Sequence, residues 1–206
     1  MKAKNIAIGA AFVAAVGAGV YWGHSPTISP VPGTKAGVER WAIKTMSDPD
    51  VAKVEMDRIV DTDITTLAAL PVPKFPNGFN VTPRFGEELK TYRVIARAVA
   101  CKLEADGDYH LILTNGTTEI GVEIPTPDYA IGSVVIGQLE QTRRQFAQMF
   151  GASTKVDTQY RKLPGTMVEV VGIGFWDREH GQRGAKNGVE LHPVLSITEA
   201  PKGKVE

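Results

Sequence analysis

The segments YRVIARAVACKL (residues 92–103), YHLILT (109–114) and TTEIGVEI (117–124) decide the fold of this chain. Each is rich in β-branched, aromatic and aliphatic residues, a composition typical of strands. Asp106-Gly107 separates the first two segments, and Asn115-Gly116 separates the second from the third. Asn-Gly favours a type I′ turn, in which both central residues have positive φ, so the pattern predicts three consecutive antiparallel strands.

The hydrophobic period changes after the third strand. Apolar residues then recur at helical spacing: Val135, Leu139, Phe146, Met149 and Phe150. Ser133 is suited to cap this helix and Gly151 to end it. Two further apolar runs, 166–175 and 189–198, have strand composition. The order strand, strand, strand, helix, strand, strand predicts a mainly β fold with one helix, an OB-like five-stranded partly open barrel over residues 90–199.

The N-terminal part has the composition of an export segment. Lys2 and Lys4 precede an uncharged apolar run, and this pattern predicts a signal peptide or signal anchor over residues 1–22. The protein is therefore expected to be exported: periplasmic, secreted, or anchored at the outer face of the inner membrane. If the segment is not cleaved, it would also provide membrane contact.

The remaining segments outside the barrel are shorter. Residues 23–37 are rich in Pro and Gly and predict an extended linker. Residues 38–89 form a small N-terminal extension, in which 39–45 is expected to be a short strand and Thr62 or Asp63 to cap a helical turn. Residues 200–206 are a polar tail.

Composition excludes several classes of protein. The 23 basic and 23 acidic residues give a net charge of zero. This balance does not support nucleic acid as a partner, although it leaves nucleic acid possible. One cysteine, Cys101, excludes an intramolecular disulfide, and its apolar surroundings predict a small buried side chain. The chain has no Walker loop, dinucleotide Gly motif, HExxH or GxSxG.

Several short motifs occur together: ERWAIKT (39–45), LEADGDYHL (103–111), EIP (123–125), HGQ (180–182) and NGVELHPVL (187–195). This combination resembles a family of exported bacterial proteins of unassigned function, over about residues 39–197. The resemblance implies a secreted or periplasmic location. It implies no reaction.

Strand alternation brings one set of polar residues to a common face. His110 lies on the second predicted strand, Glu123 on the third and His192 on the fifth. If these strands align, the three side chains form a cluster suited to a divalent metal, with His180 and Asp108 as candidate acid–base groups. The alternative is structural: His/acid pairs also serve packing, and His192 before Pro193 would then end a strand.

A second possible site uses loops. In OB-folds the loops between the first two and the last two strands flank the ligand, and here these are 104–108 and 176–188. Tyr109, Trp176, Arg178 and Arg183 would form a binding surface there; alternatively, Trp176 closes the barrel. The leading expectation is an exported, envelope-associated binding or interaction module for an unknown ligand or envelope protein. The alternative is a metal-dependent hydrolase that uses the histidine and carboxylate cluster, with phosphodiesters as one possible substrate class.

Overall fold

The computed structural model describes residues 30–75, 77–178, 181, 183–201 and 203. The predicted signal segment (1–22), the start of the linker and the candidate residue His180 lie outside this part. Within it, no helix combines the length and the apolar character needed to cross a membrane. The strands and helices below are therefore those of the extension and the predicted barrel.

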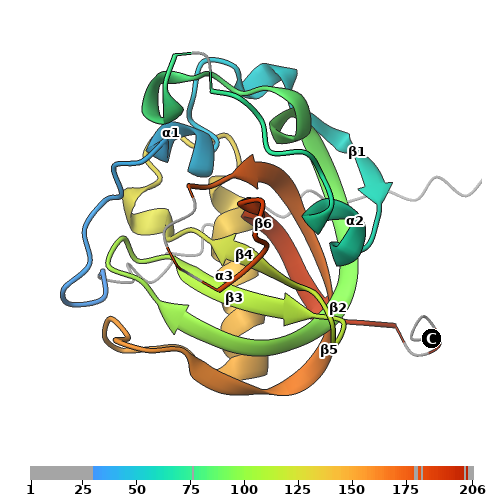
Figure 1. Cartoon of the computed structure of the whole chain (residues 1–206). Helices are drawn as coiled ribbons and strands as arrows, with labels where there is room; N and C mark the ends of the chain where they lie inside the picture. Colours follow the sequence, from blue (N-terminus) through green and yellow to red (C-terminus); the bar gives the residue numbers. More distant parts are fainter. Residues whose placement is uncertain (1–29, 76, 179–180, 182, 202, 204–206) are drawn as a thin grey trace, which may run out of the picture.

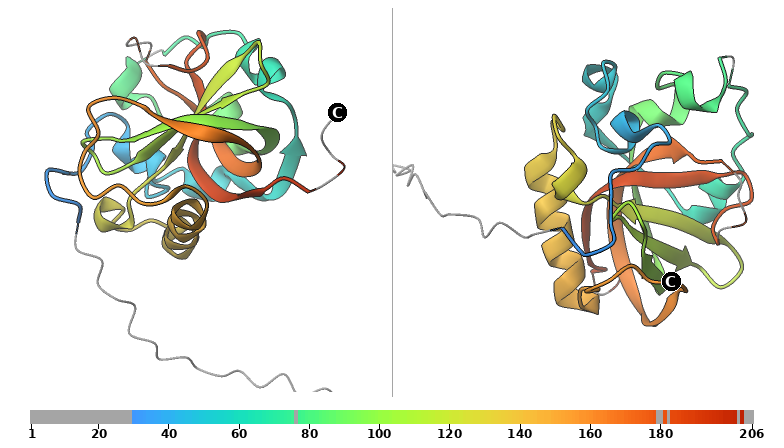
Figure 2. Two further views of the ribbon diagram at one scale, coloured as in Figure 1. Left: turned by 90° about the horizontal axis from the view of Figure 1, so that it is seen from below. Right: turned by 90° about the vertical axis from the view of Figure 1, so that its left-hand side faces the viewer.

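One six-stranded sheet forms the body of the protein (Figures 1 and 2). Its strands are β1 Glu55–Asp61, β2 Lys90–Leu103, β3 Tyr109–Thr114, β4 Glu119–Ile124, β5 Arg161–Trp176 and β6 Val189–Glu199. They run in the order β1-β2-β3-β4-β6-β5, and β5 also pairs with β2. The sheet thus closes in a partial ring, whose β4–β6 seam is parallel and joins only two residue pairs.

The prediction of a mainly β chain is confirmed, with two corrections. The sheet has six strands rather than five, because β1 of the extension pairs in parallel with the start of β2. The predicted helix is α3 Ile136–Phe150, and the predicted helical turn of the extension is α2 Ile64–Ala68, capped by Asp63. The second correction is α1 Trp41–Lys44, which replaces an expected strand, since Arg40 adopts a left-handed conformation and Thr45 bonds back to Trp41.

The β3–β4 hairpin forms as predicted, but its turn is of another kind. Thr114 pairs with Glu119, so four residues form the loop. Gly116 has a φ of 100°, whereas Asn115 does not have positive φ, as a type I′ turn would require. Instead, the Asn115 side-chain oxygen accepts hydrogen bonds from the backbone N–H groups of Thr117 and Thr118. An Asn side chain can organise a turn in this way without positive φ.

One face of the ring forms the main core. The alternate residues of β3 and β4 point into it, and it also receives Phe146 from α3, which packs chiefly against β6. Figure 2 shows α3 lying along one side of the strands. Cys101 is fully buried in this core, as predicted, and burial raises the pKa of its thiol to about 11. Its role is therefore packing rather than thiolate chemistry.

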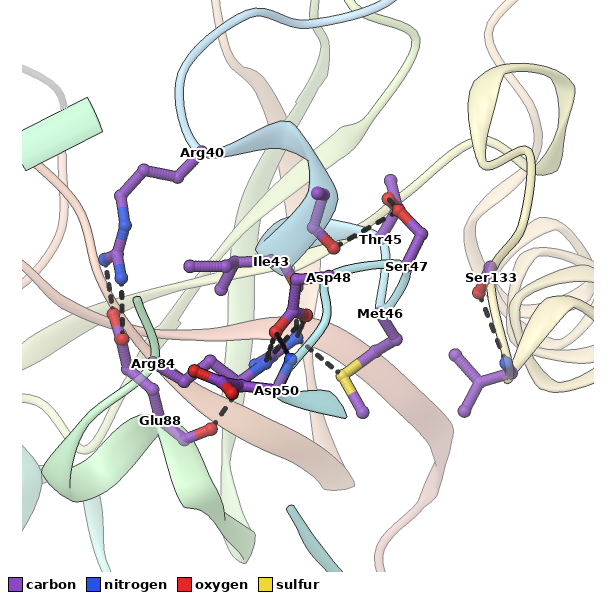
Figure 3. A network of polar contacts seen from close by, with 12 residues as sticks. Arg40, Ile43, Thr45, Met46, Ser47, Asp48, Asp50, Arg84, Glu88 and Ser133 are labelled. Carbon is purple, nitrogen blue, oxygen red and sulfur yellow. Dashed lines mark hydrogen bonds and ion pairs between the residues drawn. The ribbon is translucent and has the colours of Figure 1, made fainter. Parts of the chain in front are cut away.

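Two buried ion pairs join parts of the extension to one another, and Glu88 of one pair also contacts the sheet (Figure 3). The Arg40 guanidinium donates to both oxygens of Glu88, at 2.5 and 2.7 Å, and Glu88 also accepts from the backbone N–H of Trp176. Arg84 donates to Asp48 at 2.9 Å and to the backbone oxygen of Ile43. Arg40 directly precedes α1, and Ile43, whose backbone oxygen accepts from Arg84, lies within it. The two ion pairs therefore fix the position of this helix.

We predict that Glu88→Gln lowers the free energy of unfolding by about 3 kcal/mol, because it leaves the Arg40 guanidinium buried without a counter-charge. Urea denaturation measures the change. The control is Glu140→Gln, since Glu140 faces Arg144 at 3.8 Å on the exposed side of α3. There we expect a change below about 0.5 kcal/mol. Equal effects in the two variants would contradict the prediction.

Candidate functional site: a buried histidine and carboxylate cluster

The face of β3, β4 and β6 that points away from the main core carries polar residues. Because Tyr109, Leu111 and Ile124 belong to the core, strand alternation turns His110 and Glu123 to the opposite face. The register places His110 directly across from Glu123. Strand β6 adds Glu190 and His192 to this face, with Glu190 paired to Gly121 across the parallel seam. The centre of this face is nevertheless buried, and His110 and His192 are both 0% exposed.

The three residues predicted from strand parity do come together. His110 Nδ1 lies 3.4 Å from Glu123 Oε1, and His192 Nδ1 lies 3.2 Å from Glu123 Oε2. Two neighbours complete the cluster: Glu104 Oε1 is 3.4 Å from His110 Nδ1, and Asp108 Oδ2 is 3.4 Å from His192 Nε2. Two three-residue sets result, Glu104–His110–Glu123 and Asp108–Glu123–His192, each with ligand atoms within 4.8 Å of one another.

These close approaches leave several buried polar atoms without hydrogen bonds. Within the described residues, neither ring nitrogen of His192 has a hydrogen-bond partner, and neither do Asp108 Oδ2 and Glu123 Oε2. His192 lies within strand β6 rather than at its end, so the strand-end role that we considered for it is wrong. A buried polar atom without a partner is costly, which suggests that a ligand or ion satisfies this group.

The two histidines have opposite protonation preferences. Burial, only partly offset by the Glu123 charge, lowers the pKa of His192 to about 3, so this ring is neutral at pH 7. Burial also opposes charge on His110, but its contact with Glu104 and the charges of Glu123 and Glu190 raise its pKa to about 9. Despite burial, His110 and Lys102 lower the pKa of Glu104 to about 2. A neutral imidazole such as His192 is the form that binds metals.

Burial raises the pKa values of other carboxyl groups in the cluster. Burial raises the pKa of Asp108 to about 6, and burial together with Asp108 and Glu104 raises that of Asp106 to about 7. Burial and the Glu123 charge raise the pKa of Glu190 well above its usual value. Lys44, supplied by α1, shows the reverse: burial opposes its charge, but the surrounding carboxylates raise its pKa overall. Carboxyl groups therefore outnumber the basic groups of the cluster, and protons neutralise part of this excess.

A cleft connects this cluster with the surface. It has a volume of about 300 Å³ and lies where residues 35–41 pass the two loops that were predicted to flank a site. Glu104, Asp106 and Asp177 come from those loops, while Glu123 and Lys44 reach the cleft from β4 and α1. A small molecule or an ion that enters here would meet Glu123 directly.

Two of the predicted binding residues are buried and cannot contact a ligand at the surface. Tyr109 and Trp176 are each 3% exposed, and Tyr109 packs on Phe146, because both aromatic side chains belong to the main core. Their prediction as surface ligand contacts is wrong. Arg183 forms an exposed ion pair with Glu119, and Arg178 lies 3.9 Å from Glu39. None of these four residues lines the cleft.

Sequence reasoning missed two residues of the cluster, Glu104 and Lys44. Glu104 lies in the first predicted loop, so its neighbourhood was visible in the pattern. Lys44 had no such signal, because α1 reaches the site only after the extension folds back over the sheet.

Comparisons with known proteins add little to this description. No family model matches the chain, and no curated protein matches it. One similar solved structure is described as "Crystal structure of a putative aspartyl-tRNA synthetase from Leishmania major Friedlin", with 12% identity and a TM-score of 0.37. The similarity covers 68% of this chain but only 21% of the solved chain. A similarity this low supports no argument about fold or function.

We predict that Gly121→Ala lowers the free energy of unfolding by about 1–3 kcal/mol, because overpacking displaces neighbours. An added Cβ would lie 2.8 Å from both Glu190 Oε1 and His110 Nε2. The control is Gly137→Ala in α3, where an added Cβ meets nothing within 4 Å and should stabilise by up to about 1 kcal/mol. Thermal and urea denaturation compare the two; a neutral Gly121→Ala would show that the cluster is loosely packed.

Proposed function

We propose that this protein binds a divalent transition metal, with zinc the best suited, through Asp108, Glu123 and His192. One observation carries the proposal. Asp108 Oδ2, Glu123 Oε2 and the His192 ring nitrogens converge in a buried position, and within the described chain none of them has a hydrogen-bond partner. Buried groups of this kind are normally satisfied, and a metal ion would satisfy all three residues at once.

The chemistry and spacing of the ligands support zinc. Imidazole and carboxylate groups bind Zn²⁺ at about 2.0–2.2 Å, which puts neighbouring ligand atoms about 3.3–3.6 Å apart in a tetrahedral site. His192 Nδ1 lies 3.2 Å from Glu123 Oε2 and His192 Nε2 lies 3.4 Å from Asp108 Oδ2, so whichever nitrogen holds the metal has a carboxylate oxygen close to this spacing. One ring nitrogen can hold the metal while the other donates its proton to the carboxylate that faces it, an arrangement that orients metal-binding histidines.

We propose further that the partial ring is an OB-like barrel. Five of its strands, β2 to β6, would form the barrel, with β1 as an addition and α3 between the third and fourth barrel strands. In OB-folds the ligand binds to one face of the sheet, between the loop that joins the first two strands and the loop that joins the last two. The cleft lies against the corresponding loops, which supports the assignment.

The setting proposed for this activity is outside the cytoplasm. The support is the basic and apolar N-terminal segment and the resemblance of the motifs to exported bacterial proteins. In that setting the protein would act as a binding module of the envelope, and an envelope protein is one partner that could receive the ion.

Metal-dependent hydrolysis is the second candidate, because Glu123 belongs to the buried set and also lines the cleft. A bound ion would supply Lewis acidity and an activated water there. Lys44 would hold an anionic substrate, such as a phosphodiester, in the cleft. Asp106, whose pKa is about 7, would exchange protons at the cleft wall.

The proposal predicts that the full chain, purified without chelator, retains at least about one equivalent of zinc by elemental analysis. After chelator treatment, added zinc should raise the melting temperature, because it binds the folded state alone. His192→Ala should lower the zinc content by about one equivalent and reduce the rise in melting temperature.

Glu119→Gln is the control, since Glu119 lies on the same strand and face as Glu123 but pairs with Arg183 at the edge. It should bind metal like the parent protein. Absence of metal in the purified chain, together with no change in melting temperature on adding zinc, cobalt or manganese, would sink the proposal.

A further inference from the structure

Glu123 presents its two carboxylate oxygens to different histidines. Oε1 faces His110 of β3, and Oε2 faces His192 of β6. This division follows from the sheet: Glu123 lies directly opposite His110 in the antiparallel pair, while the parallel β4–β6 seam brings His192 to its other side. A carboxylate between two sets of ligands is the group that bridges the ions of two-metal sites.

From this arrangement we propose that the cluster is a dinuclear metal centre in which Glu123 bridges two divalent ions. This inference rests on the proposed metal-binding function and adds a second ion to it. The second ion would lie in the set Glu104–His110–Glu123, whose ligand atoms are also within 4.8 Å of one another. This outer ion would be nearer the cleft, because Glu104 and Glu123 both line it.

The charge of the cluster favours bound cations. Carboxyl groups outnumber the basic groups in it: Glu104, Asp106, Asp108, Glu123 and Glu190 face Lys44, Lys102 and Arg143, and also His110 when it is protonated. Buried charge is costly unless it is paired. Divalent ions would replace the protons that the metal-free cluster holds.

Gly121 leaves space beside His110, a residue of the outer ligand set. A Cβ at residue 121 would lie 2.8 Å from both His110 Nε2 and Glu190 Oε1, so the glycine frees space on the far side of the imidazole. His110 Nε2 is buried, and the described residues give it no hydrogen-bond partner. Glu190 Oε1 borders the same space, so a water there would connect it with the Nε2 proton of His110. Such support on the second nitrogen orients a metal-binding histidine.

Lys102 competes for the outer position. Its Nζ lies 2.7 Å from Glu104 Oε1, the oxygen that would bind the ion. In the metal-free protein the Lys102 ammonium group neutralises Glu104, and the outer ion would take over this role. Because the Lys102 side chain is 19% exposed, it can turn toward solvent when the ion binds. The outer ion should therefore bind more weakly than the inner one.

The test is a titration of the chelator-stripped full chain with Zn²⁺, followed by calorimetry and elemental analysis. The parent protein should take up about two equivalents in two steps, whereas His192→Ala and His110→Ala should each take up about one. Lys102→Met should tighten the weaker step by about 10-fold or more, because it removes the competing cation. Glu119→Gln should behave like the parent protein.

Manganese gives a readout that does not depend on the variants. Two Mn²⁺ ions bridged by Glu123 are about 3.5–4 Å apart and should give an exchange-coupled electron paramagnetic resonance spectrum, which Glu123→Gln should abolish. Uptake that stops at one equivalent in the parent protein, with an uncoupled manganese spectrum, overturns the dinuclear centre but leaves the single-ion function intact. Uptake of no metal overturns both.

Discussion

Ionised carboxylates cannot remain in a closed protein interior without compensating cations, and this constraint shapes the structure around β3, β4 and β6. Asp108, Glu123 and Glu190 are almost completely buried, although the face that carries them is not the main core. The extension closes over them and brings only one ammonium group, that of Lys44. The buried charge therefore calls for protons or metal ions, and the pKa values of the metal-free cluster reflect the protons.

The Arg40–Glu88 pair connects this site to the stability of the fold. Glu88 lies just before β2 and also accepts a hydrogen bond from Trp176 at the end of β5, so one carboxylate joins the extension to two strands. The same pair fixes α1, from which Lys44 reaches the cluster. The Arg40–Glu88 pair is neutralised, whereas the acidic cluster is not, and this contrast supports our proposal that the cluster binds metal ions.

The sequence predicted the grouping of His110, Glu123 and His192 better than the segments that cover them. Strand parity was sufficient to select His110, Glu123 and His192, because the Asn115-Gly116 hairpin fixes the register between β3 and β4. The mistake over Tyr109 has the same origin: alternation sends it to the opposite face from His110, and α3 covers that face with Phe146. No local pattern predicts how residues 38–89 fold back, so neither β1 nor the covering of the cluster was foreseen.

Crystallography of the zinc-loaded full chain with data at the zinc absorption edge tests the central claim most directly. The account predicts an anomalous peak between β3, β4 and β6, within about 2.0–2.2 Å of Glu123 and His192 atoms. A second, weaker peak should lie beside His110. Zinc found only at surface side chains, with the cluster keeping its closely spaced side chains and no ion between them, would contradict the account.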